Sequence, residues 1–145
     1  MTRKTSFGFS FLIVMTSSLA DPMTADAYDR SYSVSVASGQ RVMAFVSSNH
    51  PHCKQGSIPN LVLVKPPSNG KVTLEPAVET FRAETCILAQ CKCVGKSLSG
   101  RGAFYVSNKG FKGTDYFEVY RPPLPAGERL KGKPEGLRRV TVTVH

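Results

Sequence analysis

The chain has 145 residues and is strongly basic, with 19 lysine and arginine residues against 10 aspartate and glutamate residues and a formal net charge of +9. A chain of this length makes a single domain and has no room for a second core. The charge bears on solubility and on acidic partners and carries no information about the fold. No nucleophile elbow, zinc-protease motif or phosphate-binding glycine loop occurs, so we expect no enzyme.

The first 20 residues have the layout of a secretory signal peptide. Arg3 and Lys4 precede the apolar run Phe7 to Met15, and small and polar residues follow up to Ala20. This run is shorter than the roughly 20 apolar residues that span a bilayer, so cleavage is expected to leave no membrane span. Cleavage after Ala20 is preferred because Ala20 is nearer to the run than the alternative, Ala27. The protein is therefore predicted to be secreted or periplasmic.

Residues 21–30 are predicted to be a flexible N-terminal segment, and residues 31–145 to form the folded domain. In the first strand Tyr32, Val34 and Val36 alternate with serines, which gives one apolar and one polar face. A turn at residues 38–40 leads to a second predicted strand, Arg41 to Val46. The two strands are predicted to pair as a hairpin.

The loop that follows contains the sequence NHPHC, which is the only cluster suited to inorganic chemistry. His50, His52 and the thiolate of Cys53 are ligands that suit zinc or copper, and other cysteines could complete the site. In an oxidising compartment the thiols are expected to be paired instead, which leaves two exposed histidines. We therefore expect no metal and no cofactor, and keep a small periplasmic metal-handling protein as the alternative function.

The middle of the chain continues with strand and turn signals. Leu61 to Val64 is an apolar run expected of a core strand, and Lys71 to Glu75 returns after a turn rich in proline, asparagine and glycine. Between residues 76 and 90 a short helix from Val78 to Thr85 and a loop are both compatible with the composition. Cys91 to Val94 is predicted to be a short strand.

The four cysteines of a small exported chain predict two disulfides. A bond between Cys91 and Cys93 is disfavoured, because residues two apart in a strand point to opposite faces. Two connectivities remain. The preferred one joins Cys53 to Cys93 and Cys86 to Cys91.

The most informative stretch is RGAFYVSNKGFKGTDYFEV, from Arg101 to Val119. Two apolar runs, Gly102 to Val106 and Tyr116 to Tyr120, flank a glycine-containing turn, which predicts a β-hairpin with a long loop. Phe117 shares its strand parity with Asp115 and opposes the charged Glu118, so Phe117 is predicted to be buried.

The remainder is a long basic connection and a last strand. The segment from Arg121 to Arg139 contains four prolines and three glycines and is predicted to be exposed, and Arg138 to Val144 is predicted to be the closing strand. Seven or eight short strands without a convincing helix predict an all-β sandwich, with a closed barrel as the alternative.

Part of the chain resembles a known family, the bacterial immunoglobulin-like and cadherin-like β-sandwich modules of exported proteins. The residues that carry the resemblance are PSNGKV (residues 67–72), VTVTV (residues 140–144), Tyr105, Phe111, Gly113, Asp115 and Phe117. The resemblance covers roughly the last 80 residues and implies a single immunoglobulin-like antiparallel β-sandwich rather than a barrel. Cadherin-like relatives often bind calcium through clustered acids, but Asp115 is the sole acid near the turn and is expected to accept backbone N–H bonds.

The fold resemblance implies a non-catalytic interaction or structural module that is exported from the cell. Tyr116 and Tyr120 are predicted to lie on a solvent face near several cations, and aromatic planes beside cations suit a polyanion. The candidate partners are an acidic polysaccharide, lipopolysaccharide or another envelope protein, and the alternative is a solvated basic loop that only keeps the protein soluble. Nucleic acid is not expected, because no nucleic-acid motif occurs. The predicted polyanion contacts are Lys109, Lys112, Arg121, Arg129, Lys131 and Lys133.

Overall fold

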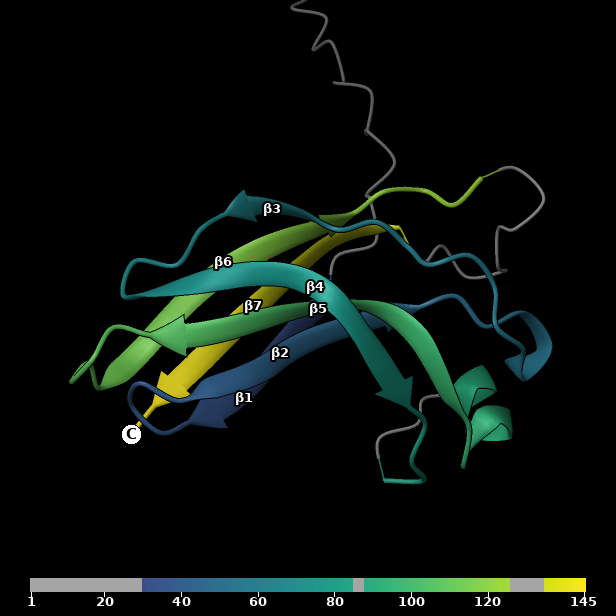
Figure 1. Ribbon diagram of the computed structural model, residues 1–145, viewed down its shortest axis with the longest axis horizontal. Helices are drawn as coiled ribbons and strands as arrows, with labels where there is room; N and C mark the ends of the chain where they lie inside the picture. Colours follow the sequence, from purple (N-terminus) through teal and green to yellow (C-terminus); the bar gives the residue numbers. More distant parts are fainter. Residues whose placement is uncertain (1–29, 85–87, 126–134) are drawn as a thin grey trace, which may run out of the picture.

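A computed structural model describes residues 30–84, 88–125 and 135–145 of the chain. The predicted signal peptide and most of the predicted flexible segment lie outside these residues. Seven strands form two sheets that pack face to face (Figure 1), which confirms the predicted all-β sandwich. The strands are β1 (Arg30–Val36), β2 (Arg41–Ser48), β3 (Val62–Lys65), β4 (Gly70–Thr80), β5 (Ser97–Ser107), β6 (Gly113–Arg121) and β7 (Gly136–Val144), and the two 3-10 segments are η1 (Pro51–Cys53) and η2 (Leu88–Cys93).

One sheet has four strands in the order β1-β7-β6-β3, and the other has three in the order β2-β5-β4. Every pair is antiparallel except β1 with β7, which is parallel. The antiparallel arrangement expected from the sequence therefore holds for all strand pairs but one. The exception is the edge pair of β1 and β7, which run in the same direction.

Both predicted hairpins are wrong, although both turns exist. The amide of Gln40 donates to the carbonyl of Ala37 at 3.0 Å, and that of Phe111 donates to Asn108 at 3.1 Å. Each turn nevertheless passes the chain from one sheet to the other, so β1 does not pair with β2 and β5 does not pair with β6. A turn reverses the chain whether the next strand pairs beside the first or packs opposite it, and burial of both inner faces selects the second arrangement here.

Three further segments differ from their predictions. The run from Leu61 is a short edge strand rather than a core strand: Leu61 is buried, but Val62 and Val64 are 45% and 54% exposed. Prolines flank this run on both sides, and proline is suited to sheet edges.

The helix considered from Val78 to Thr85 does not form in its described part, because Val78 to Thr80 continue β4 in register with β5. Eleven residues of β4 pair continuously with β5, so backbone pairing overrides the helical preference of the local composition. Cys91 to Cys93 belong to the 3-10 segment η2 and not to a strand.

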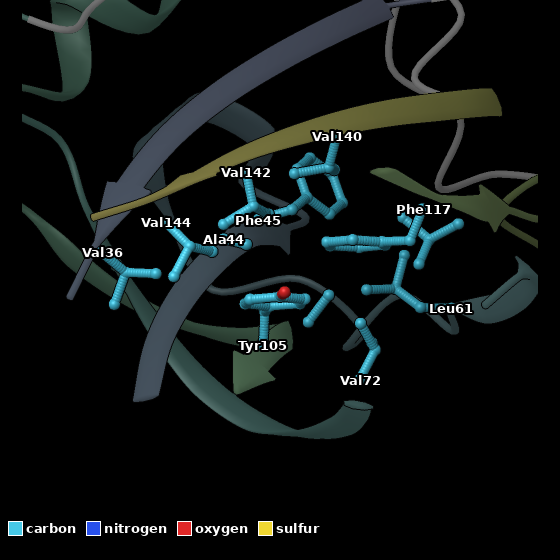
Figure 2. Close-up of a cluster of buried hydrophobic side chains, with 12 residues drawn as sticks. Val36, Ala44, Phe45, Leu61, Val72, Tyr105, Phe117, Val140, Val142 and Val144 are labelled. Carbon is cyan, nitrogen blue, oxygen red and sulfur yellow. The ribbon is translucent and has the colours of Figure 1, made fainter. Parts of the chain in front are cut away.

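The core lies between the sheets and follows the alternation of the strands (Figure 2). Phe117 is fully buried, as predicted, and Val119 on the same strand is buried with it. Figure 2 shows the ring of Phe117 lying parallel to that of Tyr105, which comes from the opposite sheet, with ring centroids 6.3 Å apart. Val140 and Val142 of β7 complete this layer, and both are fully buried.

Candidate functional site: a lysine-bearing end of the sandwich

The carboxylate of Asp115 organises one end of the sandwich. Asp115 lies in β6, is 4% exposed and accepts four hydrogen bonds. One oxygen accepts from the amides of Ser68 and Tyr116 at 3.0 and 2.9 Å, and the other accepts from the amide of Asn69 and the hydroxyl of Tyr105, both at 2.9 Å. The acceptor role expected for Asp115 is thus confirmed, although the residue lies in a strand rather than in a turn.

These hydrogen bonds determine the ionisation of both partners. Burial alone would raise the pKa of Asp115, but the donors from Tyr116, Tyr105, Asn69 and Ser68 together lower that pKa below its usual value. Burial, and then the hydrogen bond to Asp115, raises the pKa of Tyr105. At neutral pH the pair is therefore a carboxylate and a neutral phenol, with the proton on the tyrosine oxygen.

Two turns are held side by side by this network. The turn between β3 and β4 supplies Ser68 and Asn69, and the carbonyl of Asn69 also accepts from the amide of Asn108 in the turn between β5 and β6, at 2.8 Å. Gly70 leaves room for the ring of Tyr105, because a Cβ atom there would lie 2.6 Å from the nearest ring carbon. Both turns lie at the left end of the molecule in Figure 1.

These two turns and the residues beside them carry exposed lysines, which we call the lysine end. The β5–β6 turn supplies Lys109 and Lys112, and Lys65 and Lys71 flank the β3–β4 turn. All four lysines are exposed. The sequence pointed to Lys109 and Lys112 but not to Lys65 and Lys71, which belong to the same end because hydrogen bonds of Asp115 and Asn108 join the two turns.

The outer face of the four-stranded sheet continues from the lysine end. The ammonium group of Lys65 lies 4.8 Å from the ring centroid of Tyr116, so an aromatic plane beside a cation is present. The hydroxyl of Tyr116 donates to the carboxylate of Glu118, and Arg139 lies 3.4 Å from the same carboxylate. Tyr120 is on the same face and is partly exposed.

Arg121 does not belong to this surface. It ends β6, nine residues from Lys112 and therefore about 30 Å away along an extended strand, and it is only 6% exposed. Its Nε and Nη2 atoms are buried without a hydrogen-bond partner. Burial, and then the nearby charge of Arg138, lowers the pKa of Arg121 to about 10. The expectation that Arg121 contacts a polyanion is therefore wrong, because its side chain is buried and does not reach the surface.

The other polyanion contacts expected from the sequence, Arg129, Lys131 and Lys133, lie outside the described residues. Of the predicted set, Lys109 and Lys112 lie at the lysine end, which also carries Lys65 and Lys71, whereas Arg121 is buried.

The loop after β2 that carries His50 and His52, which we call the histidine loop, lies at the end of the sandwich opposite to the lysine end. The ring of His50 contacts that of Phe81 in a tilted arrangement, with ring centroids 4.8 Å apart and an interplanar angle of 55°, and burial lowers the pKa of His50. His52 is exposed and adopts a positive φ of 53°. Cys53, the third candidate ligand, is joined to Cys93 in a disulfide, so its thiolate is not available to a metal. Among the described residues no group of three histidine, cysteine or acidic side chains could hold a metal ion.

The Cys53–Cys93 disulfide confirms the preferred pairing of these two cysteines and joins η1 to η2. Cys91 is also disulfide-bonded, and its predicted partner, Cys86, lies outside the described residues.

Comparison with family models, with curated proteins and with solved structures gives no match for this chain. No helix in the described ranges is long and apolar enough to cross a membrane.

Proposed function

We propose that the chain is an exported, non-catalytic immunoglobulin-like module that binds an acidic polysaccharide of the cell envelope through the lysine end. The observation that carries the proposal is the pairing of two lysine-bearing turns by the Asn108–Asn69 hydrogen bond and the buried carboxylate of Asp115. This pairing holds several cations on one rigid end of a domain, which is what a flexible anionic chain requires of a binding surface.

The strand arrangement supports the immunoglobulin-like part of the proposal. Immunoglobulin-like sandwiches place the second, fifth and fourth strands in one sheet and the third, sixth and seventh in the other. The same division occurs here, with β1 added beside β7. The motif residues also meet in space, since the turn of PSNGKV, Tyr105 and Asp115 form one hydrogen-bonded group. The Cys53–Cys93 disulfide supports export, because disulfides persist in oxidising compartments.

The charges near the lysine end support an anionic ligand. Asp115 is buried, and the exposed carboxylate of Glu75 is paired with Arg41 at 2.6 Å. Glu118 is paired with Arg139. These acids are therefore engaged or covered and leave the ammonium groups of the lysine end accessible to a ligand. The elongated, repeating charge of an acidic polysaccharide lets one chain contact several of these lysines at once.

Retention on an immobilised acidic polysaccharide, eluted with a salt gradient, tests the proposal. The test variant is Lys71→Gln/Lys109→Gln/Lys112→Gln, which removes three charges from the lysine end. The matched control is Lys54→Gln/Lys92→Gln/Lys96→Gln, which removes three charges from exposed lysines at the opposite end. We expect the test variant to elute at markedly lower salt than the control, because only its charges contact the ligand.

Equal shifts for the two triple variants would show that retention reflects net charge alone and would contradict a localised site. Thermal unfolding of both variants provides the check on folding, because exposed lysines away from packed contacts change stability little.

A further inference from the structure

The outer face of the four-stranded sheet presents a regular array of hydroxyl groups, which we call the hydroxyl face. Its strands alternate buried apolar residues with outward ones, and serine or threonine occupies three outward positions of β1, two of β7 and one of β6. Five of the six residues are exposed and Thr141 is partly exposed. The hydroxyl face consists of Ser31, Ser33 and Ser35 of β1, Thr141 and Thr143 of β7, and Thr114 of β6.

The register of the sheet aligns these side chains in rows. Thr143 lies between Ser35 and Thr114, and in the next row Thr141 lies between Ser33 and Tyr116. Neighbouring hydroxyls are therefore spaced about 4.8 Å across the strands and about 6.7 Å along them. Of the six hydroxyls, that of Ser35 lies within hydrogen-bond distance of the ring of His145, at 3.2 Å.

The chemistry of this face suits a carbohydrate chain better than a protein. Serine and threonine hydroxyls both donate and accept hydrogen bonds, as sugar hydroxyls do. Protein interfaces are centred on apolar and aromatic anchors, and none of the large exposed apolar residues of the described chain lies on β1, β6 or β7. On the outer face of this sheet, Val62 lies opposite Tyr120, at the edge strand β3 and away from the six hydroxyls. Tyr116 adds an aromatic plane to the second row.

The hydroxyl face also adjoins the lysine end. Lys112 is separated from Thr114 by one residue, and Lys65 covers the ring of Tyr116. The first two rows contain no carboxylate, so an acidic chain that leaves the lysines meets no like charge there. The third row contains Ser31, Arg139 and Glu118, in which the carboxylate is paired with the arginine.

We infer that the hydroxyl face is a carbohydrate-binding surface across which the polysaccharide held at the lysine end is laid. This inference rests on the proposed function and specifies its ligand: a polymer whose sugar hydroxyls, and not only its charges, are recognised. The lysines supply the salt-dependent part of the affinity, and the threonine and serine hydroxyls distinguish a sugar chain from other polyanions.

The test compares two polymers that each carry one carboxylate per monomer, a polyuronate and poly-L-glutamate of matched length. Dissociation constants are measured for the full chain and for a Thr141→Val/Thr143→Val variant, which keeps β-branched side chains of the same shape. We expect the natural sequence to bind the polyuronate about tenfold more tightly than poly-L-glutamate. The variant should lose this preference and bind poly-L-glutamate with unchanged affinity.

A Thr80→Val/Ser97→Ala variant is the control, since it removes two exposed hydroxyls from the other sheet; it should keep the preference. Equal affinity of the natural sequence for both polymers would overturn the inference and leave the proposed function standing. A preference that survives in the Thr141→Val/Thr143→Val variant would also overturn it. Failure to bind either polymer would overturn the inference and the proposed function together.

Discussion

The two ends of the sandwich bury charge in opposite ways. At the lysine end the carboxylate of Asp115 is 4% exposed and accepts four hydrogen bonds. At the other end the guanidinium of Arg121 is 6% exposed, and two of its nitrogen atoms have no hydrogen-bond partner. Similar burial therefore has different consequences for the free energy of unfolding, because a buried charge stabilises the fold only where its polar atoms have hydrogen-bond partners.

The two ends are also held together by different interactions, hydrogen bonds at the lysine end and a disulfide at the other. Asp115 connects two turns through side-chain and backbone hydrogen bonds, and its network needs no covalent link. Around Arg121 the nearby charges are the like charge of Arg138 and the carboxylates of Glu79 and Glu135. The Glu79 carboxylate also accepts from the amide of Ser48 at 2.9 Å. This end has the Cys53–Cys93 disulfide, which holds the histidine loop against η2.

Removal of the disulfide should have the largest effect on stability. The bond closes a loop of 40 residues, and the chain-entropy model assigns about 4 kcal/mol to a loop of that length. A Cys53→Ser/Cys93→Ser variant should therefore unfold at clearly lower denaturant concentration. Its retention on acidic polysaccharide should stay the same under native conditions, because the lysine end does not depend on this bond. Reduced retention by the folded variant would show that the two ends are coupled.

An Asp115→Asn substitution should have the next largest effect. The amide oxygen of asparagine can still accept two of the four hydrogen bonds, but its NH₂ group would face the donors that the second carboxylate oxygen accepts, the Asn69 amide and the Tyr105 hydroxyl. Unsatisfied buried donors cost about 1–3 kcal/mol each, so we expect a loss of about 2–4 kcal/mol in urea unfolding. In a Tyr105→Phe background the loss should be smaller, because one of the two opposed donors is absent.

The same carboxylate predicts an acid-dependent loss of stability. The pKa of Asp115 is lower in the folded protein than in the unfolded chain, so the unfolded state binds a proton first as the pH falls. The stabilisation by Asp115 is therefore present at neutral pH, and it decreases below about pH 4, where the unfolded aspartate titrates. Unfolding experiments between pH 2 and 6 should show a smaller acid loss for Asp115→Asn than for the natural sequence. Parallel pH profiles for the two proteins would contradict this assignment.

Arg121→Met should have the smallest effect on stability, in spite of the burial of the residue. The substitution removes a desolvated charge whose Nε and Nη2 atoms are unpaired and keeps much of the side-chain volume. Replacement of buried ionic groups by apolar ones of similar size is often neutral or stabilising. We expect a change within about 1 kcal/mol of the natural sequence or a modest stabilisation. A loss as large as that of Asp115→Asn would show that Arg121 has a stabilising partner.

The sequence predicted the strands and their inner faces better than the pairing between strands. Alternation along β6 identified Phe117 as buried because one polar residue, Glu118, is enough to mark the outer face of a strand. Turn residues at 38–40 and 107–113 identified chain reversals, but no local signal distinguishes a hairpin from a connection between two sheets. Excluding a bond between Cys91 and Cys93 left two connectivities, and the Cys53–Cys93 pair was preferred because its companion bond, Cys86 to Cys91, closes a small loop.

The candidate site was predictable only in part, for a similar reason. Lys109 and Lys112 are near the resemblance motif in the sequence. Lys65 and Lys71 belong to the same end because a hydrogen bond joins their turn to one that is about 40 residues away in the sequence. Arg121 was expected to be exposed because of its charge, but its parity along β6 is that of Phe117 and Val119. The parity of Arg121 along the strand therefore indicated burial, although its charge favoured exposure.

Hydrogen exchange of individual amides in the Asp115 network tests most directly whether this carboxylate joins the two turns into one rigid end. The amides of Ser68 and Asn69 donate to Asp115, and that of Asn108 donates to Asn69. NMR should show all three protected to nearly the same extent as the core amides of β6, with Asn69 losing protection in Asp115→Asn. Exchange of Ser68 and Asn69 at the rate of an exposed loop in the natural sequence would contradict the account.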